Sequence, residues 1–236
     1  MSQSESPQRI YRHRIMTRLW HWVNVLAVFV LIGSGLMISN AHPHLYWGQF
    51  GANFDPAWLH PPRFPGWITI PSEYNLAMAR RWHLTFALLF AFNLAVFMIA
   101  SLLNGHIVRD LRIRPADIAP RHLWADIRAH LRLRFHDPER PDAYNILQKL
   151  AYVSVIFVAL PLLVLTGLTL SPAMNAAWPW LLDIFGERQS ARSIHFIACW
   201  AVMVFIVVHL LLVLLAGPVN EIRSMITGRW RIPDEH

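Results

Sequence analysis

Charged residues are scarce in this 236-residue sequence. Asp, Glu, Lys and Arg make up 15% of it, whereas soluble proteins contain about 25%. Hydrophobic residues account for 55% of the chain, and its mean hydropathy is +0.35. A composition so poor in charge and so rich in apolar residues excludes a water-soluble enzyme and an intrinsically disordered chain.

Cysteine is almost absent as well. The single cysteine, Cys199, lies within an apolar run, so the chain has neither an internal disulfide nor a Cys-x-x-Cys-His motif that attaches haem covalently. Acidic residues number 14 against 21 basic ones, which gives a net charge of +7. Because the basic residues gather in particular loops and no nucleic-acid-binding motif accompanies them, we expect membrane lipid, and no nucleic acid, as their partner.

Four runs contain no Asp, Glu, Lys or Arg and have 20, 22, 21 and 23 residues: Leu19–Ile38, Trp82–Leu103, Leu150–Leu170 and Ile194–Ala216. A helix needs about 20 apolar residues to cross ~30 Å of hydrocarbon, and backbone polar groups in lipid must pair within their own segment. The sequence therefore predicts an all-α membrane protein. We expect a bundle of four transmembrane helices in a single domain, 1–236, with spans at about 17–38, 81–103, 148–170 and 192–216.

The loops differ strongly in positive charge. Alternate segments carry 16 basic residues on one side of the membrane and 5 on the other. Because Lys and Arg are retained in the cytoplasm, we expect both termini and the 104–147 loop to be cytoplasmic, and the 39–80 loop to be outside. Within the cytoplasmic loop, apolar residues at helical spacing predict an amphipathic helix at Pro120–Phe135 that lies on the anionic leaflet.

The outer loop is rich in proline and aromatic residues, which include Trp47, Trp58 and Trp67. Two interpretations stay open. The aromatic side chains form an interfacial belt at headgroup depth, or the loop folds into a cap that docks another protein.

Four histidines lie inside the apolar runs, where ionisable residues are costly and mark function. His195 and His209 are fourteen residues apart on one predicted helix, so they share a face and are separated by about 21 Å along the axis. The alternating directions of the helices then pair His21 with His209 on the cytoplasmic side, and His83 with His195 on the outer side. The depths of His21 and His209 match only if the first helix begins before its apolar run, near Ile10.

Two pairs of imidazoles stacked across a membrane favour two b-type haems, because each haem iron takes two axial imidazoles from facing helices. Zinc would require four ligands at one point, and a proton relay usually adds acidic residues, which these runs lack. We therefore expect non-covalent, bis-histidine haem with His21, His83, His195 and His209 as iron ligands. A haem-free transporter or assembly scaffold is the alternative from another functional class.

Small and basic residues near the histidines fit haem but are equally typical of membrane helices. Glycines that would let a flat macrocycle approach the backbone also favour plain helix packing: Gly33, Gly35 and Gly167. Arginines that flank the histidines could pair with haem propionates or extend to the interface: Arg18, Arg80, Arg81 and Arg192.

Four motifs occur in order along the chain: Arg18-Leu-Trp-His-Trp22, Arg81-Trp-His83, Asn145-x-x-Gln148-Lys149 and His195-x13-His209. Together they resemble the bacterial cytochrome b561 superfamily. The chain is most similar to the di-haem cytochrome b subunits of nickel–iron hydrogenase, formate dehydrogenase and thiosulfate reductase complexes, from about Arg12 to Arg229.

The resemblance implies a multi-pass protein of the bacterial inner membrane that holds one haem between His21 and His209 and another between His83 and His195. It also implies a quinone site beside the cytoplasmic-side haem, formed by Asn145 with Gln148 and Lys149, and no catalytic residue beyond quinone redox chemistry. Electrons would pass between the quinone pool and a periplasmic redox partner. That partner is a molybdopterin oxidoreductase, a hydrogenase or an iron–sulfur or cytochrome c protein.

One departure from the family concerns the 39–80 loop, which is longer and more aromatic than in these members. Such loops are similar to those of cytochromes that accompany sulfite-oxidase-type molybdopterin enzymes. A stand-alone cytochrome b561 that oxidises superoxide and reduces quinone is the alternative within the same fold.

The quinone assignment predicts the effect of Asn145→Ala. Loss of the amide should weaken quinol-dependent reduction several-fold while both haems remain, because the side chain contacts quinone and not iron. Stopped-flow reduction by a quinol analogue, with the haem content measured in parallel, tests this expectation. An unchanged response to quinol would remove Asn145 from the site.

Overall fold

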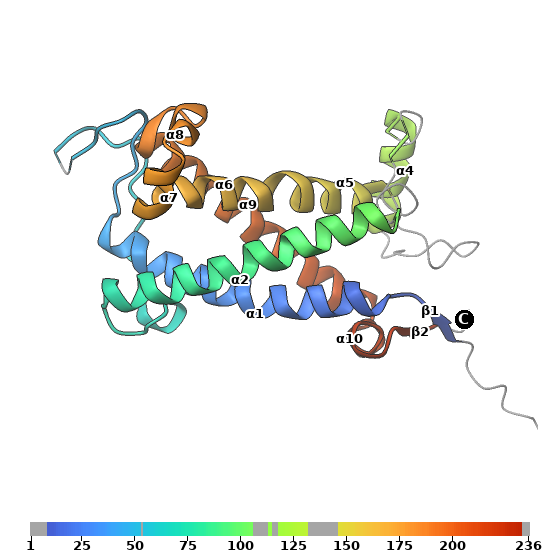
Figure 1. Ribbon diagram of the computed structural model, residues 1–236. Helices are drawn as coiled ribbons and strands as arrows, with labels where there is room; N and C mark the ends of the chain where they lie inside the picture. Colours follow the sequence, from blue (N-terminus) through green and yellow to red (C-terminus); the bar gives the residue numbers. More distant parts are fainter. Residues whose placement is uncertain (1–8, 53, 106–112, 115–117, 132–145, 233–236) are drawn as a thin grey trace, which may run out of the picture. The chain divides into compact units, whose positions relative to one another are not determined.

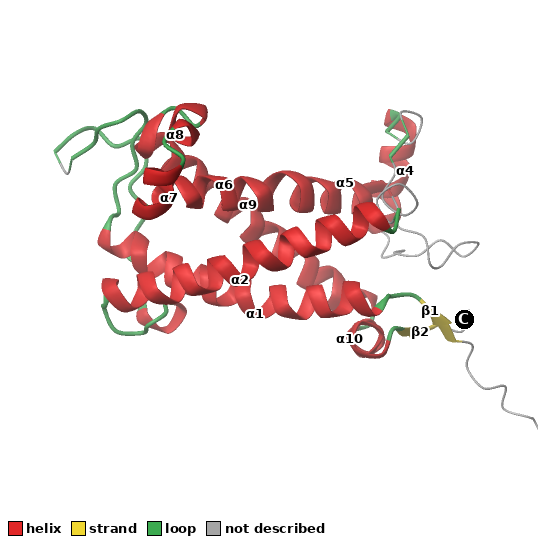
Figure 2. Ribbon diagram, in the orientation of Figure 1, coloured by secondary structure: helices red, strands yellow, loops and turns green. Residues whose placement is uncertain are grey.

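The protein is almost entirely helical (Figures 1 and 2). Its structure, a computed structural model, describes residues 9–52, 54–105, 113–114, 118–131 and 146–232. The predicted all-α membrane fold is confirmed, with one departure in the described residues: two three-residue strands, β1 (Arg9–Tyr11) and β2 (Arg229–Arg231), pair antiparallel.

Four helical segments are long and apolar enough to cross a membrane: α1 (Ile15–Ala41), α2 (Leu76–Leu103), the segment Ile146–Leu170 and α9 (Glu187–Ala216). Each begins before the predicted span, and α1 also extends beyond its end. The reason is that polar and charged residues at the membrane interface continue a helix whose apolar middle alone is visible as a hydrophobic run.

The first helix begins at Ile15 and not near Ile10, because Arg9–Tyr11 pair in a strand instead. This start nevertheless places His21 and His209 at similar distances from the ends of their helices. His21 is six residues from the beginning of α1 and His209 is seven from the end of α9, which is about 9 and 10.5 Å along the respective helices. The two side chains are thus about equally far from their helix ends.

The third span is not a uniform α-helix. It consists of α5 (Ile146–Ser154), the π-helical segment η2 (Val155–Ala159) and α6 (Leu160–Leu170). Pro161 explains the irregularity, because its ring removes one backbone donor and clashes with the carbonyl four residues earlier, which favours a locally wider turn.

The chain forms two compact units, and their boundaries cross the long helices. The terminal unit comprises residues 1–22, 96–154 and 205–236, and the loop unit comprises 23–95 and 155–204. His21 and His209 belong to the terminal unit, whereas His83 and His195 belong to the loop unit. We describe each unit by itself.

The terminal unit contains the two strands together with α4 (Pro120–Leu131) and α10 (Pro218–Thr227). The helix predicted at Pro120–Phe135 is therefore present to Leu131, and its last four residues lie outside the described part of the chain. Trp124 is exposed on α4, with the guanidinium of Arg128 5.9 Å from its ring centroid.

The loop unit holds the aromatic loop, a 3₁₀ turn η1 (Gly66–Ile68) and two short helices, α7 (Pro172–Ala177) and α8 (Trp180–Ile184). The loop is folded onto the start of α9. The Gly48 carbonyl accepts the backbone N–H groups of Gln189 (3.0 Å) and Ser190 (3.3 Å), which are donors that a helix leaves unpaired in its first turn. These contacts favour the folded cap over a loose interfacial belt, and docking of another protein by this cap stays a prediction.

Burial in the spans is typical of a helix bundle surrounded by lipid. The most buried positions include small hydroxyl residues, Ser34, Thr166 and Thr169, whereas large apolar side chains such as Phe92 and Val207 are exposed. Lipid solvates apolar side chains, so close packing of small residues holds membrane helices together.

Candidate functional site

The structure brings together the two predicted histidine pairs. In the loop unit, His83 of α2 faces His195 of α9, with ring centroids 6.3 Å apart and an interplanar angle of 64°. In the terminal unit, His21 of α1 faces His209 of α9, at 6.4 Å and 61°. Two separate pairs thus have nearly the same geometry.

These separations fit one metal ion between two imidazoles. An imidazole nitrogen binds a first-row metal at about 2.0–2.1 Å, and the centre of the five-membered ring lies about 1.1–1.2 Å further, so two imidazoles that ligate one iron from opposite sides would have centroids about 6.2–6.6 Å apart. Among the described residues, no group of three or more His, Cys, Asp or Glu side chains is placed to hold a metal. Each pair therefore offers two ligands, the number that the axial positions of a haem iron need.

Hydroxyl groups contact the loop-unit pair on the side of the ring away from Nε2. Ser34 Oγ of α1 lies 3.0 Å from Nδ1 of His83, and Thr166 Oγ1 of α6 lies 2.9 Å from Nδ1 of His195. Each of the two histidines thus has a hydroxyl partner on a neighbouring helix.

The direction of these hydrogen bonds follows from the single proton of a hydroxyl group. Ser34 Oγ donates that proton to the Val30 carbonyl (2.6 Å), and Thr166 Oγ1 donates to the Leu162 carbonyl (2.6 Å). Each hydroxyl must then accept from the histidine, so Nδ1 carries the imidazole proton. This tautomer leaves the Nε2 lone pair available for a metal, and the hydrogen bond raises the basicity of the ligand.

Glycine follows each hydroxyl residue and faces the same ring. A Cβ at Gly35 would lie 3.4 Å from Cε1 of His83, and one at Gly167 would lie 3.5 Å from Cε1 of His195. A side chain larger than a methyl group at either position would contact the imidazole. The predicted Gly33 has a different neighbour, since its Cβ would lie 2.8 Å from Cγ1 of Ile70 in the folded loop.

The terminal-unit pair has different surroundings. The Phe205 ring stacks on His209 at 5.9 Å, and among the described residues no group hydrogen-bonds to the buried Nδ1 of His21. Gln148 and Lys149, half-buried on α5, belong to the same unit. Asn145, the first residue of the predicted quinone motif, lies outside the described residues.

Two of the flanking arginines meet at one histidine of the loop unit. The Arg80 guanidinium lies 3.3 Å from Nε2 of His42, and the Arg192 guanidinium donates to the His42 carbonyl. Burial, with the charges of Arg192 and Arg80, holds the pKa of His42 below its usual value, so its neutral ring accepts from Arg80. Of the other predicted propionate residues, Arg81 is exposed, and Arg18 donates to the Ile226 carbonyl.

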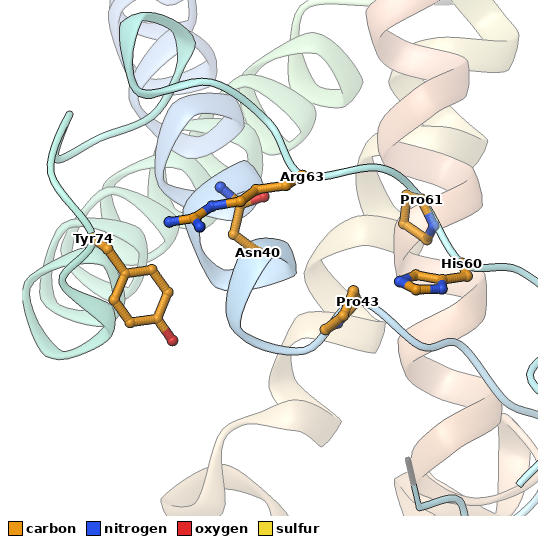
Figure 3. Close-up of a pocket in the computed structure, with 6 residues that line it drawn as sticks. All are labelled: Asn40, Pro43, His60, Pro61, Arg63 and Tyr74. Atoms are coloured by element: carbon orange, nitrogen blue, oxygen red, sulfur yellow. The ribbon is translucent and has the colours of Figure 1, made fainter. Parts of the chain in front are cut away.

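A separate pocket of about 470 Å³ opens in the folded loop (Figure 3). The Arg63 guanidinium lies 5.8 Å from the centroid of the Tyr74 ring within it. Its lining residues belong to the loop and the end of α1, and none of them belongs to a histidine pair: Asn40, Pro43, His60, Pro61, Arg63 and Tyr74.

Comparison with known proteins agrees with this arrangement. The family model for prokaryotic cytochrome b561 matches residues 12–228. The chain belongs to this family. With its four apolar helices, it is therefore a multi-pass b-type cytochrome of the bacterial inner membrane that takes part in electron transfer and binds b-type haem.

Relatives of this cytochrome extend over nearly its whole length. A probable Ni/Fe-hydrogenase B-type cytochrome subunit of Cupriavidus necator is 24% identical over 97% of this chain and 89% of its own. A putative protein-methionine-sulfoxide reductase subunit of Azospira oryzae is 28% identical over 92% of this chain and 96% of its own. A putative cytochrome of Escherichia coli is 28% identical over 98% of this chain and 78% of its own.

Sequence reasoning missed the hydroxyl partners of the loop-unit histidines and the role of His42. A signal for the hydroxyls was present, because Ser34-Gly35 and Thr166-Gly167 repeat the same hydroxyl–glycine pair within two apolar runs. His42 had no such signal, since only the folded loop brings it to two arginines of different helices.

The hydroxyl contacts predict the effect of Thr166→Val on the haem of this cytochrome that His195 would ligate. Loss of the acceptor makes the imidazole a weaker electron donor and destabilises ferric iron. The midpoint potential should rise by on the order of 40 mV, the equivalent of about 1 kcal/mol for one hydrogen bond. Spectroscopic redox titration measures this shift.

Thr169→Val is the matched control, because Thr169 is equally buried on the same helix but donates to the Thr166 carbonyl (2.6 Å), and it forms no hydrogen bond with a histidine among the described residues. Equal shifts in the two variants would exclude a specific effect of the Thr166 hydroxyl on the iron ligand.

Proposed function

We propose that this cytochrome carries two haems b and transfers electrons between a periplasmic redox subunit and the quinone pool. His83 and His195 would hold one haem, and His21 and His209 the other. The observation that carries the proposal is the pair of matched imidazole separations, 6.3 and 6.4 Å, in a chain of the b561 family.

Bound between the paired imidazoles, the haems would supply reversible one-electron transfer. The protein's residues set the conditions for it. In the loop unit, Ser34 and Thr166 would hold both half-buried imidazoles in the tautomer that presents Nε2.

Arg80 and Arg192 are the proposed partners of the propionates in the loop unit. Each lies three residues before a histidine of the pair, about one helical turn away, and His42 holds the two guanidinium groups near one another. Arg18, three residues before His21, would serve the haem of the terminal unit. Arginine suits this role because its planar fork binds carboxylates in a bidentate manner.

Quinone would exchange electrons with the haem of the terminal unit. Gln148 and Lys149 of α5 lie in the same unit as His21 and His209. An amide and an ammonium group are the donors that quinone oxygens require, and we assign Asn145 to the same site from its motif. The excess of basic residues in the predicted cytoplasmic loops supports a position of this site on the cytoplasmic side, where protons would exchange with water.

The partner would dock on the folded aromatic loop of the loop unit. This assignment draws on the names of the relatives, which describe subunits of a hydrogenase and of a methionine-sulfoxide reductase. It also draws on Trp47 and Trp58, which stack at 5.4 Å and remain half-exposed. We propose a periplasmic catalytic subunit, either a hydrogenase or a molybdopterin oxidoreductase, as the electron partner.

The proposal predicts two haems per chain by pyridine haemochrome assay and the loss of one of them in His209→Ala. Because the other pair lies in a different unit, its haem should remain and be reduced by dithionite, while quinol-dependent reduction should fall at least tenfold. Optical spectra of the purified protein measure both quantities.

His60→Ala is the control, since His60 lies in the loop and its ring contacts that of His44, with centroids 4.1 Å apart, outside both pairs. A colourless wild-type protein would contradict the proposal. So would a His209→Ala variant that retains two haems, or one that loses both equally.

A further inference from the structure

The two ends of the described chain are joined in the terminal unit. Strand β1 pairs with β2 so that Ile10 faces Trp230, and the backbone N–H groups of Arg12 (2.8 Å) and His13 (3.3 Å) both donate to the Gly228 carbonyl. The segment that precedes α1 is therefore held by the segment that follows α10.

Gly228 makes this pairing possible. Its φ is +81°, a conformation that L side chains rarely adopt, and a Cβ there would lie 2.6 Å from Cε2 of Tyr11 and 2.9 Å from the His13 carbonyl oxygen. A turn this tight against the first strand requires glycine.

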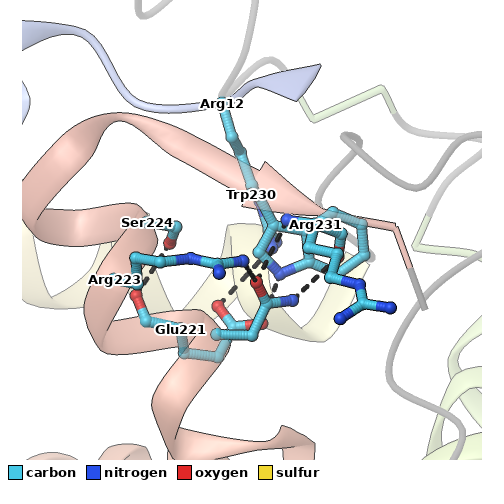
Figure 4. Close-up of polar contacts among 7 residues, drawn as sticks. Arg12, Glu221, Arg223, Ser224, Trp230 and Arg231 are labelled. Carbon is cyan, nitrogen blue, oxygen red and sulfur yellow. Dashed lines mark hydrogen bonds and ion pairs between the residues drawn. The ribbon is translucent and has the colours of Figure 1, made fainter. Parts of the chain in front are cut away.

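A buried aromatic and an ion pair anchor the strand to α10 (Figure 4). The Trp230 indole, 1% exposed, donates to the Glu221 carboxylate at 2.8 Å. The same carboxylate lies 3.5 Å from the Arg12 guanidinium, whose carbon is 5.1 Å from the Trp230 ring centroid. With side-chain exposures of 8% for Arg12 and 16% for Glu221, solvent and salt screen this ion pair less than a surface pair.

A second residue of α10 holds the backbone of β2. The Asn220 amide donates to the Arg231 carbonyl (2.8 Å), and its oxygen accepts the Arg231 N–H (3.0 Å). Hydrogen bonds thus join helix α10 and strand β2, residues 218–231, into one element, which we call the C-terminal clasp.

The clasp also binds α1 on both sides of His21. The Trp22 indole donates to the Met225 carbonyl at 3.0 Å, and the Arg18 guanidinium donates to the Ile226 carbonyl. Both carbonyls belong to the last turn of α10, where a helix leaves its acceptors unpaired. His21 lies between the two bonded residues in the sequence.

The clasp is also connected through the chain to the helix that carries His209. Helix α10 follows directly after α9, which carries His209, with Gly217 at φ +103° between the two helices. One element therefore continues the helix of His209 and is hydrogen-bonded to the helix of His21. Both histidines lie within two turns of their helix ends, where helices fray unless other groups hold them.

We infer that the C-terminal clasp is the positioning element of the terminal-unit haem site, keeping His21 at the distance from His209 that one iron requires. Trp230 and Trp22 are positioning residues. Trp230 acts through α10, whereas Trp22 acts through its bond to α10 and through its ring, which lies edge-on to the His21 ring with centroids 5.1 Å apart. This inference rests on the proposed function, because it assumes that the two imidazoles are axial ligands.

The test compares Trp230→Ala and Trp22→Phe in the full-length protein. Trp230→Ala removes the buried anchor of the clasp, whereas Trp22→Phe removes only one hydrogen bond to α10 and keeps an aromatic ring. We expect the affinity for one haem to fall about tenfold in Trp230→Ala, as loss of supporting contacts does at other metal sites, and by a smaller factor in Trp22→Phe. The haem affected should be the spectral component that His209→Ala removes.

Two further readouts separate positioning from general loss of structure. The electron paramagnetic resonance signal of that same haem should broaden or shift, since it reports the angle between the imidazole planes, while the other haem keeps its signal and midpoint potential. Trp180→Ala is the control. Trp180 is exposed on α8 in the loop unit, so this variant should leave the terminal-unit haem unchanged.

Three outcomes would overturn the inference: both haems retained with unchanged signals in both variants, equal loss of both haems, or loss of the other haem alone. Failure of the proposed function is recognised separately. In that case His21→Ala and His209→Ala would themselves remove no haem, whatever the clasp variants do.

Discussion

The arrangement of side chains around the paired histidines depends on a constraint that the bilayer imposes on imidazole. A histidine side chain within lipid has two ring nitrogens and no water to satisfy them, so each nitrogen needs a partner from the protein or from a cofactor. In the loop unit, Ser34 and Thr166 satisfy Nδ1 of His83 and His195. The remaining Nε2 of each ring is therefore the atom that a metal would bind.

The two histidine pairs differ in how the described residues meet this constraint. Hydroxyls on neighbouring helices pair with Nδ1 of both loop-unit rings, whereas in the terminal unit no described group hydrogen-bonds to Nδ1 of His21 and the ring of Phe205 stacks on His209. A hydrogen bond to Nδ1 raises ligand basicity and lowers a haem potential. If each pair holds a haem, as we propose, this difference in surroundings would give the two haems unequal midpoint potentials.

Much of the fold was predictable because its determinants are local. Charge-free runs of about 20 residues predict membrane helices. The fourteen-residue spacing of His195 and His209 puts both on one face of their helix, whatever helices pack against it. The irregularity of the third span was only partly predictable. Pro161 indicates that the α-helix is interrupted near this residue, but packing decides that the interruption is a π-helical segment before the proline. The strand at Arg9–Tyr11 had no local signal, since its partner lies more than 200 residues away.

Sequence alone therefore determined the four spans, the family and the four histidines, because hydrophobic length and helical periodicity act within a single segment. Only the tertiary structure decided which side chains support those histidines. Ser34 contacts His83, His42 contacts both Arg80 and Arg192, and Trp22 of α1 donates to the Met225 carbonyl of α10. Each of these contacts joins residues on different elements, and a hydrogen bond between distant segments depends on how the chain packs, which no periodicity within one segment encodes.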